Sequence, residues 1–465
     1  MSFVPDYTTA SLAAAVCAAI IVYGLVLAIY RLWLSPVSGF PGAFWAKVTF
    51  WYEFYYDWVK PGQYYRRIRE MHQQYGPIIR VSPTEVHIED PLFYHEVFLP
   101  ANVRRTDAYQ RYAQGTGFED IFAMVGTHEG HKLLRDPVEK LYSKILTHEP
   151  TVFECVRTFC GRLNKKRDTG KVLNLSHACL SLAIDVATRV TFQGPSHYLN
   201  DPTFNEKLFN IQKSGLVYIP LFAHLPAPLR LVSQSIGQFL ASYIPEFREW
   251  DEIIQQNGIF HVSSTIQTVI TQLCLDEKQR RKVQDELATF WAEHPQEVTS
   301  LYALRKLPYL TACLYEGLRL GAGALNRSPR VFPDDEIVYK GWFIPKGTPF
   351  SMTSHYMHMD PTVFPEPGIF NPARWFGPGS EPEGIMHKYL IPFGKGSRAC
   401  AGPNIAWMQM YFAISQLYQP SAPEIRLFES DESDVRLEHG YIFPLPRLES
   451  RGVRIIIRGS HMNGL

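Results

Sequence analysis

An unbroken run of apolar residues near the N-terminus is the first pattern along the chain. Leu12 to Tyr30 contains no charged residue and consists mainly of Ala, Val, Ile and Leu. About twenty such residues are needed for a helix to cross a bilayer. A cleaved signal peptide is the alternative, but no basic region precedes the run, and the run is long for a signal peptide. The pattern predicts a membrane anchor over residues 1–30, with a transmembrane helix over about 12–30.

The charges on either side of this run predict its orientation. Arg31 follows directly and Lys47 lies soon after, whereas the residues before the run carry only Asp6. Because positive charge favours the cytosolic side, the body of the protein should face the cytosol. The Pro- and Gly-containing residues 31–45 should form a stiff hinge. No flexible linker or repeat divides residues 46–465, so we expect a single domain there.

Hydrophobic periodicity beyond the hinge predicts a mainly helical protein. Residues 63–75 form a charged amphipathic pattern, and apolar residues recur at helical spacing in 173–192 and 231–254. Two short segments, 78–82 and 85–88, are typical of the strands of a β-hairpin. The first half of the domain should therefore combine long helices with a small sheet.

Short strand patterns return in the second half of the chain. They cover residues 336–339 and 342–344, and a Pro-rich irregular stretch runs from 361 to 384. An apolar, helix-like run begins at Ile405, and residues 453–457 again resemble a strand. The predicted fold class is mainly α with a minor β portion.

Composition argues against a nucleic-acid-binding protein and indicates the redox compartment. The net charge of +1 gives no broad electrostatic case for binding nucleic acid. The seven cysteines contain no Cys-x-x-Cys pair and no disulfide-like array, which suits a reducing compartment.

The residues best suited to binding a cofactor or metal lie in a glycine-rich loop, Phe393–Gly402, with the sequence FGKGSRACAG. Its glycines allow the backbone to approach a flat cofactor and to turn amides toward the sulfur of Cys400. The helix that follows places partial positive charge near this cysteine, which favours the thiolate. Arg398 is a permanent cation suited to a cofactor carboxylate. A buried structural cysteine in a tight turn is the alternative interpretation.

These ten residues resemble the haem-binding loop of the cytochrome P-450 superfamily. The resemblance extends over about residues 30–458. It implies that Cys400 is the axial thiolate ligand of the iron of haem b (iron protoporphyrin IX), and that Phe393 packs against the porphyrin near the sulfur. It also implies a triangular prism of helices in which residues 46–465 form one haem-binding catalytic domain.

Two further motifs carry the resemblance. Glu316 and Arg319 lie three residues apart in a helical pattern and match the family's Glu-x-x-Arg, although alone they would be an ordinary surface pair. Arg374, in the sequence FNPARW, matches the second arginine motif. The resemblance implies a buried Glu–Arg–Arg network whose role is structural, since buried charges are costly unless fully paired.

The haem propionates require cations, and four residues match family positions for them. Arg398 precedes the cysteine, and Arg330 lies just before the returning strands. His131 and Arg135 are four residues apart on a predicted helix and match the Trp/His-x-x-x-Arg motif, with a solvated helix face as the alternative.

The central motif of the family is missing. Family members carry Ala/Gly-Gly-x-Asp/Glu-Thr-Thr on a long helix over the haem, where the acid and threonine manage protons during oxygen activation. An ungapped alignment places this motif on residues 257–262, where only the glycine matches. Phe260, His261 and Val262 occupy the positions of the acid and the two threonines.

The length of this region indicates an internal loss. A helix that crosses a domain of about 45 Å needs about 30 residues, but residues 254–273 provide only about twenty. Loss of several turns near 255–265 explains this better than divergence does. His261 and Ser263 are the candidate replacements for the proton relay, although a histidine at such a junction is more often packed or exposed.

The resemblance implies a haem-thiolate monooxygenase that inserts one oxygen atom from O2 into an apolar small molecule. Its electrons would come from NADPH through NADPH-cytochrome P-450 reductase, with cytochrome b5 as a second possible donor, since the chain has no flavin or nicotinamide motif. Residues 51–57 and 340–348 most resemble fungal secondary-metabolism members, such as trichodiene oxygenase-like enzymes acting on terpenoids. The implied location is the endoplasmic reticulum membrane, with a single span and the domain in the cytosol.

Two other functions remain open. The absent acid–threonine pair also fits a haem-thiolate isomerase or dehydratase that uses no O2. The absence of this pair is equally compatible with an inactive, truncated haem-binding protein.

Overall fold

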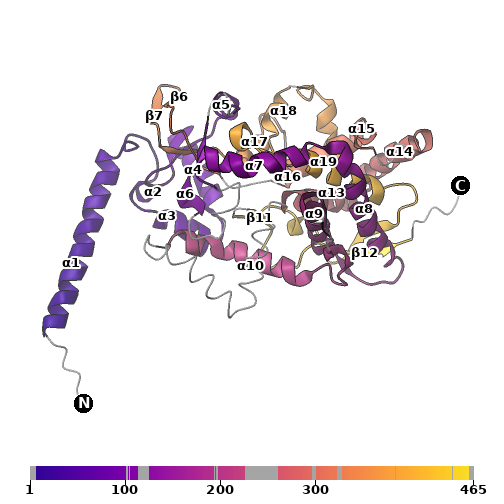
Figure 1. Ribbon diagram of the computed structural model, residues 1–465, viewed down its shortest axis with the longest axis horizontal. Helices are drawn as coiled ribbons and strands as arrows, with labels where there is room; N and C mark the ends of the chain where they lie inside the picture. Colours follow the sequence, from indigo (N-terminus) through magenta and orange to yellow (C-terminus); the bar gives the residue numbers. More distant parts are fainter. Residues whose placement is uncertain are drawn as a thin grey trace, which may run out of the picture.

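The computed structural model describes residues 7–100, 103, 105–113, 125–192, 194, 197–225, 260–295, 300–321, 327–382, 384–441 and 443–459. Figure 1 shows one long helix, α1, projecting from an elongated body of helices and small sheets. The expected fold class, mainly α with a minor β portion, is confirmed.

Helix α1 spans Tyr7–Ile29 and continues into a π-helical turn, η1, at Tyr30–Leu34. The most apolar 18-residue stretch within Ser11–Leu34 has a mean hydropathy of 2.7, and none of that stretch is buried against the rest of the protein. A helix that is apolar all round must find an apolar environment. By length and composition, this helix is long enough to cross a membrane.

The remaining described helices form most of the body (Figure 1). In chain order they are α2 (Phe44–Val48), α3 (Trp51–Phe54), η2 (Tyr55–Val59), α4 (Tyr64–Tyr75), α5 (Pro91–Val97), α6 (Gln110–Ala113), α7 (His128–Tyr142), α8 (Ile145–Asn164), α9 (Leu175–Phe192), η3 (Tyr198–Asn200), α10 (Glu206–Ala223), α13 (Phe260–Leu275), α14 (Glu277–Glu293), α15 (Leu301–Leu304), α16 (Pro308–Leu320), α17 (Ser354–His358), η4 (Pro372–Phe376), α18 (Ile385–Tyr389), η5 (Gly396–Arg398), α19 (Pro403–Leu417) and η6 (Glu432–Asp434).

The described strands form four small sheets. The strands are β1 (Ile78–Arg80), β2 (Val86–Ile88), β3 (Asp107–Ala108), β4 (Leu173–Asn174), β5 (Arg330–Val331), β6 (Ile337–Tyr339), β7 (Trp342–Ile344), β8 (Pro349–Ser351), β9 (Glu424–Leu427), β10 (His439–Gly440), β11 (Pro444–Leu445) and β12 (Arg454–Arg458). The largest sheet has the order β1-β2-β8-β5-β3, with β2 and β8 parallel and the other pairs antiparallel. A second sheet has the order β4-β12-β9, and β6–β7 and β10–β11 are hairpins.

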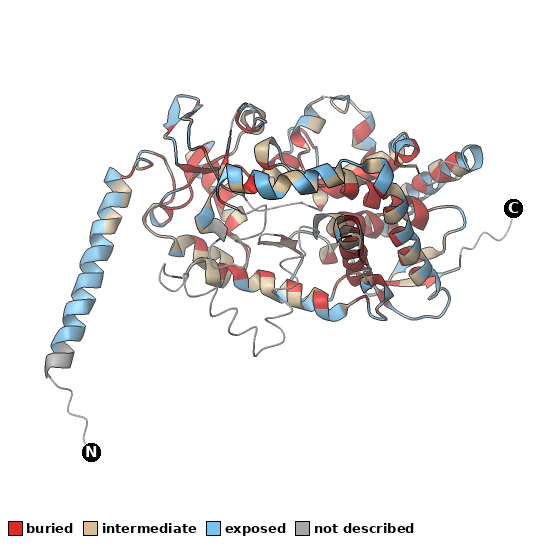
Figure 2. Ribbon diagram, in the orientation of Figure 1, coloured by how far each residue is buried: buried red, intermediate tan, exposed pale blue. Residues whose placement is uncertain are grey.

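The main core lies where α8, α9, α13, α16 and α19 pack together. Figure 2 shows α9 buried along most of its length, as expected for a helix with other helices around it. Helices α13 and α16 approach closely at Gly317, where an added Cβ would lie 2.4 Å from a methyl carbon of Val269. This close packing fixes α16, which supplies two residues of the candidate site.

Most local predictions are confirmed. The hairpin pairs Ile78 with Ile88, helix α4 covers the predicted 63–75 segment within one residue, and β6–β7 form the second hairpin. The predicted helix over 173–192 is corrected at its start, because Leu173–Asn174 form strand β4 beside β12. Asn174 Oδ1 accepts the backbone N–H of Ser176, 3.0 Å away, which marks the boundary between strand and helix. The helix predicted over 231–254 lies outside the described residues.

Candidate active site

The cysteine loop is built by two left-handed glycines and a closing hydrogen bond. Gly394 and Gly396 have φ of 66° and 81°, a conformation that other residues rarely adopt. The backbone N–H of Cys400 donates to the carbonyl of Phe393 at 2.8 Å. The backbone N–H of Gly402 donates to Cys400 Sγ at 3.3 Å. The loop therefore presents the sulfur with an amide turned toward it, immediately before α19.

The pKa of the Cys400 thiol is raised, whereas the N-terminus of the following helix alone would lower it. The residue is exposed to solvent, yet surrounding protein partly desolvates its thiol. This burial raises the pKa of Cys400, and the opposing contributions of the Gly402 amide and Arg135 are smaller. The sequence-based expectation that the helix favours the thiolate is therefore outweighed by desolvation. A bound metal would supply the missing positive charge and deprotonate the thiol.

Arg398 connects the cysteine loop by hydrogen bonds to residues that precede α7. Its Nε donates to the carbonyl of Thr106 at 3.0 Å, and its Nη1 and Nη2 donate to the carbonyls of Val125 and Gly126, each at 2.7 Å. Burial and the charge of Arg330 lower the pKa of Arg398 to about 10. The guanidinium of Arg398 therefore holds the cysteine loop in place, and it is also a buried cation.

Helix α7 brings two more of the predicted residues to the loop. Arg135 donates to the carbonyl of Ala399 and pairs with Glu139 at 3.0 Å. His131, one turn earlier, is buried, and burial together with the charges of Arg398 and Arg135 lowers its pKa to about 3. His131 is therefore a neutral imidazole at physiological pH.

Arg330 completes a cluster of cations beside the cysteine loop. It lies on β5, and burial lowers its pKa to about 10. Within the part of the chain that the structure describes, neither Arg330 nor Arg398 pairs with a carboxylate side chain. Arg398 is buried and Arg330 is half-buried, and their charges repel one another, so a bound anion would relieve this repulsion. Two carboxylates of one ligand would do so.

The residues present fit haem. Cys400 offers one soft sulfur ligand, and no group of three His, Cys, Asp or Glu side chains among the described residues could hold a metal alone. Haem would supply the remaining ligands of such a metal, and its two propionates suit the cations Arg330 and Arg398. Haem, when bound through a thiolate, supplies an iron that activates dioxygen.

Aromatic packing supports the loop on its inner side. Phe393 is half-buried, and its ring lies 6.0 Å from that of Trp407 on α19. Trp407 in turn meets Tyr315 of α16 edge-on at 5.8 Å. This stack places apolar surface beside the loop, consistent with the predicted shielding role of Phe393.

The three predicted network residues meet in the structure. Glu316 accepts from Nε and Nη2 of Arg319, both at 2.8 Å, and pairs with Arg374 at 3.3 Å. Trp375 Nε1 also donates to Glu316 at 3.0 Å, and the backbone N–H of Asn371 donates at 2.9 Å. Glu316 and Arg319 are completely buried. The network joins α16 to the irregular chain that leads to the cysteine loop.

Glu316→Gln is expected to lower the free energy of unfolding by about 3–5 kcal/mol, because it leaves two buried guanidinium groups without their anion. Chemical denaturation monitored by circular dichroism measures this loss. Glu277→Gln is the control, since its pair with Arg281 on α14 is exposed and should be worth less than about 1 kcal/mol. Equal effects of the two substitutions would contradict a structural role for the network.

The described structure places neither candidate for the proton relay, His261 or Ser263, next to Cys400. Ser263 is buried on α13 and lines a pocket with residues of α9, α10 and the β10–β11 hairpin. No residue of the cysteine loop lines that pocket. The side chain of His261 lies outside the described residues.

Sequence reasoning missed the residues that anchor the loop from a distance. The hydroxyl of Thr106 bonds with that of Ser397 at 2.8 Å, and the ring of Tyr142 lies 3.2 Å from where a Cβ would stand at Gly402. Tyr94 approaches Gly394 from α5. No local pattern marks these residues, since each is far from residue 400 in sequence.

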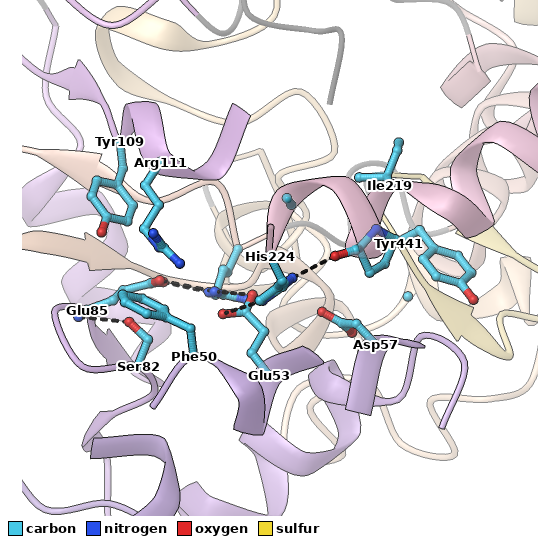
Figure 3. Close-up of a pocket in the computed structure, with 14 residues that line it drawn as sticks. Phe50, Glu53, Asp57, Ser82, Glu85, Tyr109, Arg111, Ile219, His224 and Tyr441 are labelled. Atoms are coloured by element: carbon cyan, nitrogen blue, oxygen red, sulfur yellow. Dashed lines mark hydrogen bonds and ion pairs between the residues drawn. The ribbon is translucent and has the colours of Figure 1, made fainter. Parts of the chain in front are cut away.

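A second polar site lies away from the cysteine loop, at the N-terminal end of the body (Figure 3). We call it the charge pocket. Arg327 bridges two buried carboxylates there, with 2.7 Å to Glu53 and 2.6 Å to Glu85. His224, at the end of α10, lies 3.9 Å from Glu53. Figure 3 shows the carboxylate of Asp57 turned toward His224, and Asp57 Oδ1 has no hydrogen-bond partner.

Asp57 should make stability depend on pH. Burial and the charge of Glu53 raise its pKa to about 7, so the folded state binds this proton more tightly than the unfolded state. The resulting stabilisation is fully present below about pH 4 and is lost as the pH rises through about 7. Asp57→Asn should therefore raise the melting temperature at pH 8 but not at pH 4, in thermal unfolding at both values. Asp285→Asn, at an exposed position on α14, should change neither. An Asp57→Asn effect that is the same at both pH values would contradict the assignment.

Comparison with known proteins agrees with this site. The cytochrome P-450 family model matches residues 47–252 and 257–420. Cytochrome P-450 monooxygenase oblB of Cochliobolus heterostrophus is 32% identical, with 93% of this chain and 94% of the relative covered. Fusicoccadiene C-8 hydroxylase of Phomopsis amygdali is 30% identical, with 93% and 94% covered, and stellatic acid synthase of Emericella variicolor is 30% identical, with 94% and 93% covered. The chain belongs to the cytochrome P-450 family, a class of oxidoreductases.

The same comparisons show a difference in length. The alignment to the Cochliobolus protein occupies 493 positions, more than the 465 residues of this chain. The relative therefore has residues that this chain lacks. The family match is interrupted between residues 252 and 257, next to the segment in which the sequence lacks the central motif.

Proposed function

We propose that the protein is a haem-thiolate monooxygenase that inserts one oxygen atom from O2 into an apolar small molecule, with a terpenoid or another fungal secondary metabolite as the substrate class. The observation that carries the proposal is the cysteine loop, which presents Cys400 two residues after the buried cation Arg398, with the half-buried Arg330 near that cation. This arrangement suits a thiolate-bound haem with two propionates. Haem b is the proposed cofactor.

The substrate class is supported by the names of relatives. Of the relatives described above, one is named for hydroxylation of fusicoccadiene and one for synthesis of stellatic acid. Electrons would come from NADPH through a separate reductase, since the sequence shows no flavin or nicotinamide motif of its own. We propose NADPH-cytochrome P-450 reductase as this partner, with cytochrome b5 as an additional donor.

A membrane anchor at the endoplasmic reticulum is the second part of the proposal. The helix over Ser11–Leu34 has no buried residue, and Arg31 near its end favours a cytosolic body. Removing residues 1–30 should convert a protein that resists carbonate extraction into one that carbonate releases. Resistance to carbonate after the truncation would show that a second segment is inserted and would contradict the single span.

The internal loss near 255–265 is the third part of the proposal. It is supported by the interrupted family match and by alignments longer than the chain. Without the acid–threonine pair, proton delivery should be poorly controlled, so the chain should consume NADPH with little product. An isomerase or dehydratase that uses no O2, or an inactive haem-binding protein, is the alternative that this absence favours.

Isotope labelling separates these functions. The purified protein is incubated with reductase, NADPH, 18O2 and fusicoccadiene as a probe substrate, and products are analysed by mass spectrometry. A monooxygenase gives a product heavier by one 18O atom that depends on reductase. A product that forms without NADPH and contains no 18O would establish the isomerase or dehydratase, and haem binding with neither product nor NADPH consumption would support the inactive protein.

A further inference from the structure

Two polar atoms of the charge pocket have no hydrogen-bond partner within the part of the chain that the structure describes. They are Oδ1 of Asp57, on η2, and the hydroxyl oxygen of Tyr441, which directly follows β10. Both residues line the pocket (Figure 3), and Tyr441 is only 5% exposed. We call these two atoms the orphan pair. Buried polar atoms are nearly always hydrogen-bonded, so two orphans in one cavity indicate that a partner is missing.

The other charged groups around the pocket are already paired within the protein. Arg327 contacts Glu53 at 2.7 Å and Glu85 at 2.6 Å, and His224 lies 3.9 Å from Glu53. These contacts leave the orphan pair as the polar part of the pocket that a ligand would satisfy. The ligand must therefore offer hydrogen-bonding atoms rather than a counter-ion for Arg327.

The rest of the lining is largely apolar. Phe50 precedes α3, while Ile219, Pro220 and Ala223 lie on α10. Water could satisfy the orphan pair but would gain nothing from these walls. Sites for small molecules typically combine apolar walls with a few polar groups that fix the orientation of the ligand. The lining thus matches a mainly apolar molecule that carries oxygen.

The pocket and the cation Arg330 share one pair of strands. Arg327 lies three residues before Arg330, so their Cα atoms are at most about 11 Å apart. Tyr109, which also lines the pocket, follows β3, and its backbone N–H donates to the carbonyl of Pro329 at 3.2 Å. Ala108 of β3 pairs with Arg330 of β5. A polycyclic terpenoid in the pocket would therefore lie close to a cation assigned to the cofactor.

We propose that the charge pocket binds the oxygenated end of the substrate, which is an alcohol rather than a hydrocarbon. This inference rests on the proposed monooxygenase function and specifies its substrate class. A hydroxyl group of the ligand pairs with Asp57, and the hydroxyl of Tyr441 donates to an oxygen of the ligand. Because a terpene hydrocarbon has no O–H group, a step that adds a hydroxyl group precedes the reaction of this chain.

A hydroxyl group suits the pocket better than a charged group does. Burial and the charge of Glu53 raise the pKa of Asp57 to about 7, so its carboxyl is partly protonated near neutral pH. An alcohol both donates and accepts, and it can pair with either form. An ammonium group would pair with the ionised form alone, and a carboxylate would be repelled by Glu53.

The test compares the binding of cedrene and cedrol, two sesquiterpenes that share a tricyclic skeleton and differ by the elements of water. Full-length, haem-supplemented protein in lipid nanodiscs is dialysed to equilibrium against empty nanodiscs of the same lipid content, so partitioning into lipid cancels. Mass spectrometry measures each compound on both sides. We expect cedrol to bind with a dissociation constant about tenfold lower than that of cedrene, because only cedrol satisfies buried polar atoms.

Two variants test whether the orphan pair causes this preference. Tyr441→Phe removes only an unpaired hydroxyl, so the fold should persist, and Asp57→Val removes the unpaired carboxylate at similar volume. Each should weaken the binding of cedrol about 3–10-fold and leave that of cedrene unchanged. Tyr302→Phe is the matched control, since Tyr302 is exposed on α15, and it should keep the full preference.

Two results would overturn the proposal. One is that the unaltered protein binds cedrol no more tightly than cedrene, which would leave the orphan pair to water. The other is a preference for cedrol that both pocket variants retain, which would place the hydroxyl group elsewhere. The reduced, carbon monoxide difference spectrum of the same samples tests the haem-thiolate function separately, so failure of that function is distinguished from failure of the pocket.

Discussion

Cys400→Ala is expected to abolish the red-shifted Soret band of the reduced, carbon monoxide-treated protein. The band depends on a thiolate ligand, and no other residue of the loop 393–402 has a sulfur atom. Alanine cannot bind the metal, and the loop backbone should persist because its glycines and the Cys400 N–H bond to Phe393 do not need the side chain. The difference spectrum should therefore lose the band completely.

Two other cysteines provide matched controls for this experiment. Cys17 lies in the N-terminal helix α1 and is exposed, whereas Cys160 is half-buried on α8. Cys17→Ala and Cys160→Ala remove a thiol without touching the cysteine loop and should keep the band. Retention of the band in Cys400→Ala would exclude this residue as the axial ligand.

Restoring a full-length central helix with Glu-Thr-Thr at the position now held by Phe260, His261 and Val262 should increase product formation. Loss of one general-acid group typically lowers a rate by about 10²–10⁴-fold, so a gain on this order is expected. The inserted turns would also extend α13 at its N-terminal end. Product per NADPH consumed, measured with reductase, is the readout.

The control for this prediction carries the same inserted turns with Ala-Ala-Ala in place of Glu-Thr-Thr. It restores the length of the helix without the proton relay, so it should recover stability but little coupled turnover. Equal and tightly coupled turnover by the unaltered chain would contradict the internal loss. In that case His261 or a neighbouring residue would carry the relay.

The local parts of the fold follow from the sequence because their signals are short-range. The cysteine loop, the hairpins β1–β2 and β6–β7, and helix α19 are each specified within about fifteen residues. The boundary at Leu173 was wrong because pairing with Ile455, far along the chain, extends the strand. Tertiary contacts override helical periodicity at such positions.

Contacts in the site between residues far apart in the sequence could not be predicted from local patterns. Arg398 was expected at a cofactor carboxylate, but its three hydrogen bonds to backbone carbonyls depend on chain more than 270 residues away. The charge pocket joins Glu53 to Arg327 across 274 positions, and no local pattern connects residues that far apart. The pKa of Cys400 also depends on burial, which the loop sequence does not contain.

The reduced, carbon monoxide difference spectrum of the unaltered protein tests directly whether it is a haem-thiolate enzyme. We expect the red-shifted band of a haem-thiolate, because the loop presents the sulfur of Cys400 with an amide turned toward it and holds the buried cation Arg398 two residues away. Absence of the band in folded, haem-supplemented protein would contradict the assignment of this chain as a haem-thiolate enzyme.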